Sequence, residues 1–172
     1  MTCYFFISVL YNLKKQMGDM MTTTVQKAGR LFFLLALTNG IGYVGASFMT
    51  PDTMNWYDNL KMSALTPPDW VFGVVWTVLF FMMSIAGFLV WNKVSPRWFV
   101  AQLGMNLLWT FSFFYLREVI FAAIVILLML YFLYKCMRDF YTQSHTASFL
   151  MVPTFVWSLF ALYLNTYIIL NN

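Results

Sequence analysis

Residues 70–92 read WVFGVVWTVLFFMMSIAGFLVWN and contain no Asp, Glu, Lys or Arg. Roughly 20 helical residues cross the hydrocarbon core of a bilayer, which is about 30 Å thick. This stretch is therefore long enough and apolar enough to span a membrane as one helix. Trp56-Tyr57 precede it and Pro67-Pro68 stand at its start, so aromatic residues gather at this point of the chain.

The whole chain has the composition of a membrane protein, because 62% of its 172 residues are hydrophobic and only 9% are charged. About a quarter of the residues of a soluble domain are charged. Further long apolar segments are Leu31–Thr50, Trp98–Leu116, Val119–Tyr134 and Ala147–Leu170. Their residues do not alternate between apolar and polar as barrel strands do. We therefore predict an all-α integral membrane protein, a bundle of five transmembrane helices over about residues 28–50, 68–92, 97–116, 118–137 and 146–170.

The Lys and Arg residues predict the orientation of these helices, because positive charge gathers in the short connections on the cytoplasmic side. The segment before the first helix carries Lys14, Lys15, Lys27 and Arg30. The next connection carries only Lys61, and the one after it carries Lys93 and Arg97. This alternation places the N-terminus inside and the C-terminus outside. Membrane topology then explains the net charge of +4. The sequence shows no basic face, so we predict no nucleic-acid partner.

Residues 1–27 form an N-terminal extension that we expect to be poorly ordered, and the five-helix domain covers residues 28–172. The apolar run Tyr4–Tyr11 is too short to span a bilayer. Lys14-Lys15 follow this run, whereas a secretory signal carries its charge before a longer apolar run. We expect either a disordered or interfacial extension or an artefact of start-site choice, since Met17, Met20 and Met21 follow.

No catalytic constellation is visible in the sequence. Every charged residue lies at a predicted helix end or in a connection, which argues against ion coupling through the spans. His145 is the only histidine, and Cys3 and Cys136 belong to no metal or disulfide motif. We predict no metal site, no cofactor and no catalytic residue for hydrolysis or acid–base chemistry, and an enzymatic activity is less expected than a binding function.

Neutral polar residues and aromatic residues recur at helical spacing in stripes on three predicted helices. The three stripes are Gln102, Asn106, Trp109 and Phe113; Phe72, Trp76 and Phe80; and Trp157, Ala161 and Asn165. Amides buried in lipid need hydrogen-bond partners, so the amide side chains should face the interior of the bundle. Two interpretations stay open: hydrogen bonds between helices, worth roughly 0.6 kcal/mol each, or an apolar ligand pocket oriented by a few amides.

The connection Pro51–Asp69 between the first two helices is the longest one, and it carries aromatic residues. Trp56, Pro67, Pro68 and Trp70 are candidate residues of a lid over the bundle, because loops on a rigid scaffold often carry function. The alternative is an aromatic belt at the membrane surface. In the first helix, Gly42 and Ala46 have small-xxx-small spacing, which favours close packing within the chain over a dimer contact.

The sequence resembles the TspO/MBR family, the tryptophan-rich sensory proteins and translocator proteins formerly called peripheral-type benzodiazepine receptors. The resemblance covers roughly Leu31 to Asn171 in four blocks of matching order and spacing. The blocks are Trp56-Tyr57-x-x-Leu60; Pro67-Pro68-x-Trp70-Val71-Phe72-Gly73-x-Val75-Trp76-Thr77; Gln102-Leu103-x-x-Asn106-x-x-Trp109; and Val152-Pro153-x-x-x-Trp157-x-x-Phe160-Ala161-x-x-Leu164-Asn165. The chain departs from the family at Leu65, where a loop tryptophan is usual, and at Thr110-Phe111, where a proline pair is usual.

The resemblance implies a five-helix membrane protein, often a homodimer, that binds porphyrins such as protoporphyrin IX. Some members also bind cholesterol and synthetic isoquinoline carboxamides or benzodiazepines. Carried over by position, Trp76 and Trp157 are pocket tryptophans, with Asn106, Trp109 and Ala161 as neighbours, and Phe72 joins them from the second-helix stripe. In some bacterial relatives the two tryptophans are associated with light-dependent breakdown of the bound porphyrin.

We therefore predict a membrane receptor or binding protein for porphyrins and related flat hydrophobic ligands, linked to tetrapyrrole handling, transport or stress sensing. The alternatives are photo-oxidative degradation of porphyrin by Trp76 and Trp157, and passive transport of a porphyrin or a sterol-like molecule. The predicted partners are such a small molecule, the lipid bilayer and a second copy of the chain. A bacterial cell envelope and a mitochondrial outer membrane both fit the sequence.

Overall fold

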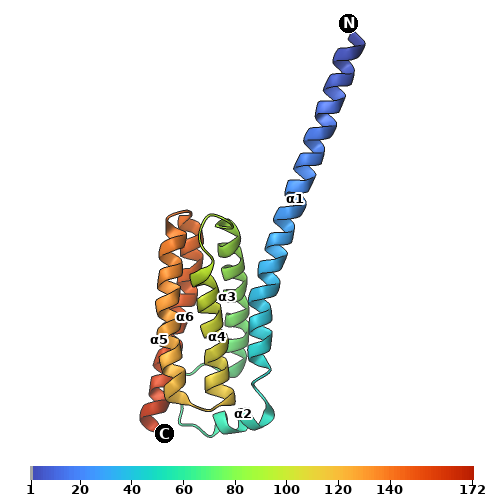
Figure 1. Cartoon of the computed structure of the whole chain (residues 1–172). Helices are drawn as coiled ribbons and strands as arrows, with labels where there is room; N and C mark the ends of the chain where they lie inside the picture. The colour runs from blue at the N-terminus through green and yellow to red at the C-terminus, as the bar shows by residue number, and fades with distance from the viewer. Residues whose placement is uncertain (1) are drawn as a thin grey trace. The chain divides into compact units, whose positions relative to one another are not determined.

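The computed structural model describes the backbone of residues 2–172 and the side chains of residues 21–172. Over this range the chain is helical and contains no strand, which confirms the all-helical fold (Figure 1). The elements are α1 (Thr2–Ala46), α2 (Pro51–Asp58), α3 (Asp69–Leu89), α4 (Arg97–Thr110), the π-helix η1 (Phe111–Tyr115), α5 (Val119–Tyr141) and α6 (His145–Asn171).

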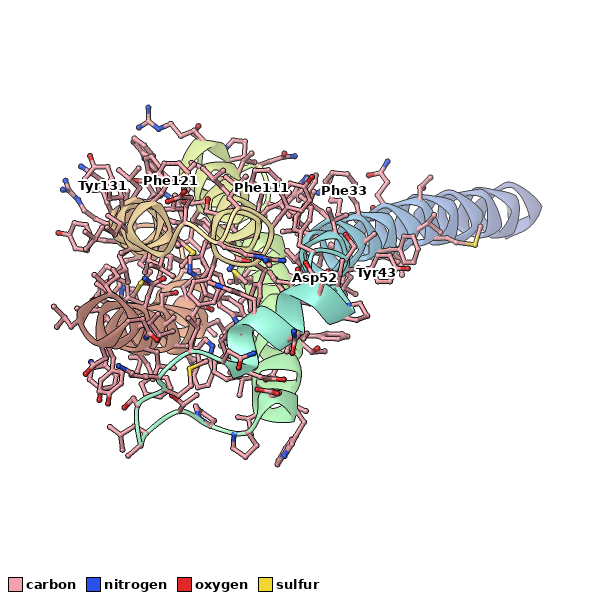
Figure 2. All side chains as sticks on the ribbon, turned by 90° about the horizontal axis from the view of Figure 1, so that it is seen from below. Phe33, Tyr43, Asp52, Phe111, Phe121 and Tyr131 are labelled. Carbon is pink, nitrogen blue, oxygen red and sulfur yellow. The ribbon has the colours of Figure 1, made fainter. Side chains whose placement is uncertain are left out.

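The chain divides into two units, one ending at Phe33 and one running from Leu34 to Asn172. In the second unit α5 packs against α4 and α6, and α6 packs against α3. The side chains of Met83, Met129, Leu133 and Met151 are fully buried among these helices. The short helix α2 lies across one end of the bundle (Figures 1 and 2).

The outer surface of the bundle is apolar. Val74, Val78 and Phe81 of α3 and Phe121 and Tyr131 of α5 are each between 42% and 55% exposed. In Figure 2 the last two point away from the helix bundle. Water would penalise such a surface in proportion to its apolar area, whereas lipid chains solvate it.

Three helices are long and apolar enough to cross a membrane by length and composition: α3, α5 and α6. A fourth span arises if residues 21–46 of α1 are counted together with α2, although the pair is bent by 72° at their break. The helix α4 has 14 residues and continues directly into the five residues of η1. The predicted count of five is therefore reached only if α4 and η1 together form one further span.

The bounds of several helices differ from those predicted. The first helix ends at Ala46 rather than at residue 50, because Thr50 caps a separate helix, α2: its Oγ1 accepts a hydrogen bond from the backbone N–H of Thr53 at 3.3 Å. Pro51 then occupies the first turn, where the missing N–H costs nothing. The predicted long loop thus contains a helix. At the other end α5 extends to Tyr141, beyond the predicted residue 137, because Phe140 is still buried.

The prediction of a poorly ordered extension over residues 1–27 stays a prediction. The backbone of α1 is helical from Thr2 onward. The side chains of residues 1–20, including Cys3 and the run Tyr4–Tyr11, lie outside the described residues.

Gly42 allows α1 to approach α3. A Cβ atom on Gly42 would lie 2.6 Å from Cε2 of Phe80, a ring that is only 4% exposed. The contact agrees with the prediction of close packing within the chain.

We expect Gly42→Ala to destabilise the protein, because overpacking a core costs about 1–3 kcal/mol. Gly40→Ala is the matched control, since a Cβ at Gly40 meets nothing within 4 Å and alanine favours the helix by up to about 1 kcal/mol. Thermal unfolding of both variants in the same detergent measures the difference. Equal melting temperatures would contradict the close packing.

Candidate functional site

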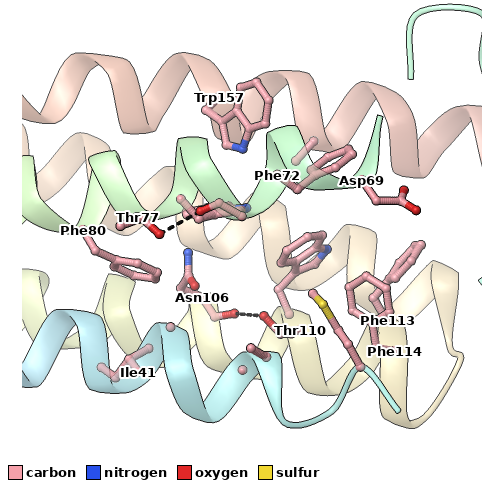
Figure 3. A pocket seen from close by; sticks show the side chains of 18 of the residues that line it. Ile41, Asp69, Phe72, Thr77, Phe80, Asn106, Thr110, Phe113, Phe114 and Trp157 are labelled. Carbon is pink, nitrogen blue, oxygen red and sulfur yellow. Dashed lines mark hydrogen bonds between the residues drawn. The ribbon is translucent and has the colours of Figure 1, made fainter. Parts of the chain in front are cut away.

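A cavity of about 470 Å³ lies within the unit formed by residues 34–172 (Figure 3). Its walls come from the end of α1, from α3, from α4 with η1 and from α6, while α2 contributes at one end. None of the residues that line it belongs to α5. The volume falls within the range of small-molecule sites, roughly 300–1,000 Å³.

The six residues that we predict to bind ligand all line this one cavity: Phe72, Trp76, Asn106, Trp109, Trp157 and Ala161. They come from α3, α4 and α6, so the three sequence stripes converge. That these residues bind a ligand stays a prediction, whereas the structure shows that all six line the same cavity.

Aromatic rings form a nearly continuous wall of the cavity. The ring of Phe72 on α3 lies 5.9 Å from that of Trp157 on α6, and Figure 3 shows the two facing each other. The ring of Trp76 lies 6.2 Å from that of Trp109 on α4, and Trp109 lies 6.0 Å from Phe113 on η1. Aromatic faces at these separations attract one another. They also present a flat, polarizable surface to a ligand.

The amide side chains are buried in the bundle as predicted, with exposures of 0% for Gln102, 5% for Asn106 and 2% for Asn165. Both interpretations of them hold in part. The side chain of Asn165 donates a hydrogen bond to the backbone oxygen of Val119, at the start of α5, at 2.7 Å, which is a bond between helices. Asn106 and Asn165 also line the cavity, whereas Gln102 lies outside it.

Three polar atoms of cavity-lining residues have no hydrogen-bond partner in the described part of the chain. They are the indole Nε1 of Trp109, the indole Nε1 of Trp157 and the amide Oδ1 of Asn165. Burying such a group unpaired costs roughly 1–3 kcal/mol. A bound molecule or water that supplies one donor and two acceptors would recover this free energy.

The predicted lid residues Trp56, Pro67, Pro68 and Trp70 do not line the cavity. Trp70 is 71% exposed at the start of α3, as an interfacial residue would be. The ring of Trp56 lies 5.7 Å from that of Phe113 and 5.9 Å from the guanidinium of Arg117. Successive residues of a helix point about 100° apart, so in α2 the next residue, Tyr57, reaches the cavity instead.

We name residues 51–68 the cap segment, because Met54 and Tyr57 from this segment line one end of the cavity. Polar contacts hold it to the bundle. Asp52 forms an ion pair with Arg117, which precedes α5. The backbone N–H of Lys61 donates to Oδ1 of Asn172 at 2.9 Å, and the hydroxyls of Ser63 and Tyr163 are also 2.9 Å apart.

Burial of Tyr57, with Asp69 and Asp58 nearby, raises the pKa of its hydroxyl to about 12. The hydroxyl therefore stays protonated at neutral pH and can donate a hydrogen bond at the capped end of the cavity. Sequence reasoning named Tyr57 but did not assign it to the site. It also missed the contribution of α1, where Asn39, Gly42 and Gly45 line the wall. The clustered glycines were the available signal.

The model of the TspO/MBR family matches residues 32–170. The chain belongs to the TspO/MBR family. This membership and the apolar helices together show an integral membrane protein.

Relatives within the family come from bacteria and animals. The tryptophan-rich protein TspO of Chlorobaculum tepidum is 36% identical over 83% of this chain and 95% of its own length. The tryptophan-rich sensory protein of Cereibacter sphaeroides is 33% identical over 78% and 87% of the two chains. The human translocator protein is 30% identical over 77% and 83%.

We expect Asp52→Asn to loosen the cap segment, because it removes the charge that pairs with Arg117. Arg117 is 38% and Asp52 81% exposed, so solvent screens the pair and its contribution is about 1 kcal/mol or less. Amide hydrogen exchange of residues 51–60 should accelerate by up to about fivefold. Asp58→Asn, at an exposed residue of the same helix, is the control. Equal exchange in both variants would show that the ion pair does not hold the cap segment.

Proposed function

We propose that this TspO/MBR family protein binds a flat, apolar tetrapyrrole such as protoporphyrin IX in the cavity between α1, α3, α4 and α6. The aromatic wall is the observation that carries the proposal. Trp76 with Trp109, and Phe72 with Trp157, present aromatic rings within one apolar space. A macrocycle gains burial and stacking there without needing a charged partner.

The names of the relatives favour transport or sensing as the consequence of binding. The human relative is called a translocator protein, and the one from Cereibacter sphaeroides a sensory protein. Either role requires a ligand-binding step, so binding is the activity to measure first. A sterol-like molecule is the competing ligand, and it belongs in the same titration.

We expect protoporphyrin IX to quench the tryptophan fluorescence of the detergent-solubilised protein, and its Soret absorption to shift on binding. In Trp76→Phe/Trp157→Phe, affinity should fall by about tenfold, because two large indole faces are lost from the wall, each worth about 0.5–1.5 kcal/mol. Affinity is read from the Soret shift, since the variant also loses two fluorophores.

The matched control is Trp98→Phe, since Trp98 stacks on Phe132 of α5 at 5.8 Å and does not line the cavity. Equal affinity in the double variant and the control would refute binding against this wall. Displacement of the porphyrin by cholesterol at equal concentration would instead assign the cavity to sterols.

We also propose five spans: α1, α3, α4 with η1, α5 and α6, with the N-terminus inside. We count α4 with η1 as one span because the helical backbone continues from α4 directly into η1. There the N–H of Leu116 donates to the carbonyl of Phe111 at 3.0 Å, so helical hydrogen bonding continues in the wider π-helical pattern. The family resemblance further implies a homodimer, for which a mass measurement in detergent is the check.

We expect cysteines introduced at Lys93 and Glu118, which flank α4 with η1, to react from opposite sides of the membrane. Both positions are exposed. The native Cys136 is 1% exposed, and Cys3→Ser removes the other thiol. In intact bacterial cells an impermeant maleimide should label the cysteine at position 118 and spare the one at 93. Labelling of both would show that α4 with η1 does not cross.

A further inference from the structure

Asp69 is the only charged residue among those that line the cavity. It is the first residue of α3 and is exposed. In Figure 3 its carboxylate lies toward the end of the cavity where Phe72 and Phe113 are found. No Lys or Arg lines the cavity anywhere along the described residues. The site therefore carries one negative charge at its rim and no positive charge to offset it.

The carboxylate of Asp69 has no hydrogen bond or ion pair within residues 21–172. Arg117, which precedes α5, is paired with Asp52 instead. The field of Asp69 nevertheless reaches the capped end of the cavity, since it contributes to the raised pKa of Tyr57.

The position of Asp69 at a helix start has an ordinary explanation as well. An acidic side chain in the first turn stabilises a helix through the helix dipole. This effect accounts for an acid at this end of α3 but not for its place on a cavity wall. An asparagine there keeps the shape of the side chain but removes the charge on which both effects depend. The two roles are therefore separated by the ligand: a weaker helix start would alter the binding of charged and neutral porphyrins alike, whereas a charge preference alters only the binding of the charged one.

The rest of the polar lining is neutral. The unpaired atoms are two indole N–H donors, from Trp109 and Trp157, and the amide oxygen of Asn165. Pyrrole nitrogens, carbonyls and ester oxygens can accept from the indoles, and an N–H can donate to the amide. A carboxylate inside the cavity would lose its hydration without gaining a cation.

We propose that Asp69 is a specificity-determining residue that makes the cavity prefer tetrapyrroles with uncharged side chains, such as esterified porphyrins, over those with free carboxylates. This inference rests on the proposed porphyrin binding and adds a charge preference to it. A free-acid porphyrin must keep its propionates away from the rim that Asp69 occupies. A neutral ester has no such restriction.

The experiment compares protoporphyrin IX with its dimethyl ester on the whole protein in one non-ionic detergent at pH 7.5. For each protein we divide the dissociation constant of protoporphyrin IX by that of its dimethyl ester. Detergent partitioning of each porphyrin then cancels between variants. In Asp69→Asn the ratio should fall by about fivefold, the effect of one like charge at a solvent-exposed distance of several ångströms. The whole change should lie in tighter binding of the free acid.

Asp139→Asn is the matched control, because Asp139 lies on α5, which contributes no residue to the cavity wall. Its ratio should equal that of the unaltered protein. Raising the ionic strength to 1 M should shrink the difference between Asp69→Asn and the unaltered protein, since screening shortens the reach of the charge to about 3 Å. A merely structural role of Asp69 would change the affinity for both porphyrins alike and leave the ratio of their dissociation constants unchanged.

The outcomes separate the two proposals. If both porphyrins bind and the ratio is the same in Asp69→Asn as in the unaltered protein, the charge preference is refuted while porphyrin binding stands. If neither porphyrin binds any of the proteins, porphyrin binding itself is refuted, and the charge preference falls with it.

Discussion

A hydrocarbon environment offers no water to buried polar groups, so each must find a partner within the protein. This constraint fixes how the helices of residues 34–172 meet. The hydroxyl of Thr38 on α1 donates to the backbone oxygen of Phe80 on α3 at 3.1 Å and lies 2.6 Å from the hydroxyl of Ser84. At the other side of the cavity, Asn165 ties α6 to the start of α5. The first bonds fix α1 against α3, and the second fixes α6 against α5.

The cavity exists because small residues and large rings alternate around it. At Gly42 and Gly45 the backbone of α1 comes close to Phe80 and Thr110, so those contacts close the bundle on one side. Ala161 on α6 leaves room beside Trp157, where a larger side chain would fill the space. Indole rings are too rigid to collapse into that space, and the volume stays open between their faces.

The all-helical fold and the placement of the three residue stripes around one cavity could be predicted from the sequence, because the fold follows from long apolar segments and the stripes from periodicity along single helices. Phe72, Trp76 and Phe80 recur on one face of any helix that contains them, and the same holds for Trp157, Ala161 and Asn165. Burial of the amides then turns these faces inward. The cap segment could not be predicted in this way. Whether Trp56 or Tyr57 enters the cavity depends on where α2 begins, and a single N-cap at Thr50 decides that.

The aromatic wall and the charged rim of the cavity differ in what they can contribute to ligand recognition. Stacking on the rings of Trp76, Trp109 and Trp157 is strong but tolerant, because any flat apolar molecule gains from it. Selectivity must then come from the few polar groups, and the buried ones are neutral. Among the described residues that line the cavity, the one charged side chain is that of Asp69, at the exposed rim. A protein built in this way can change its choice of ligand at the rim while the wall and the helix contacts stay as they are.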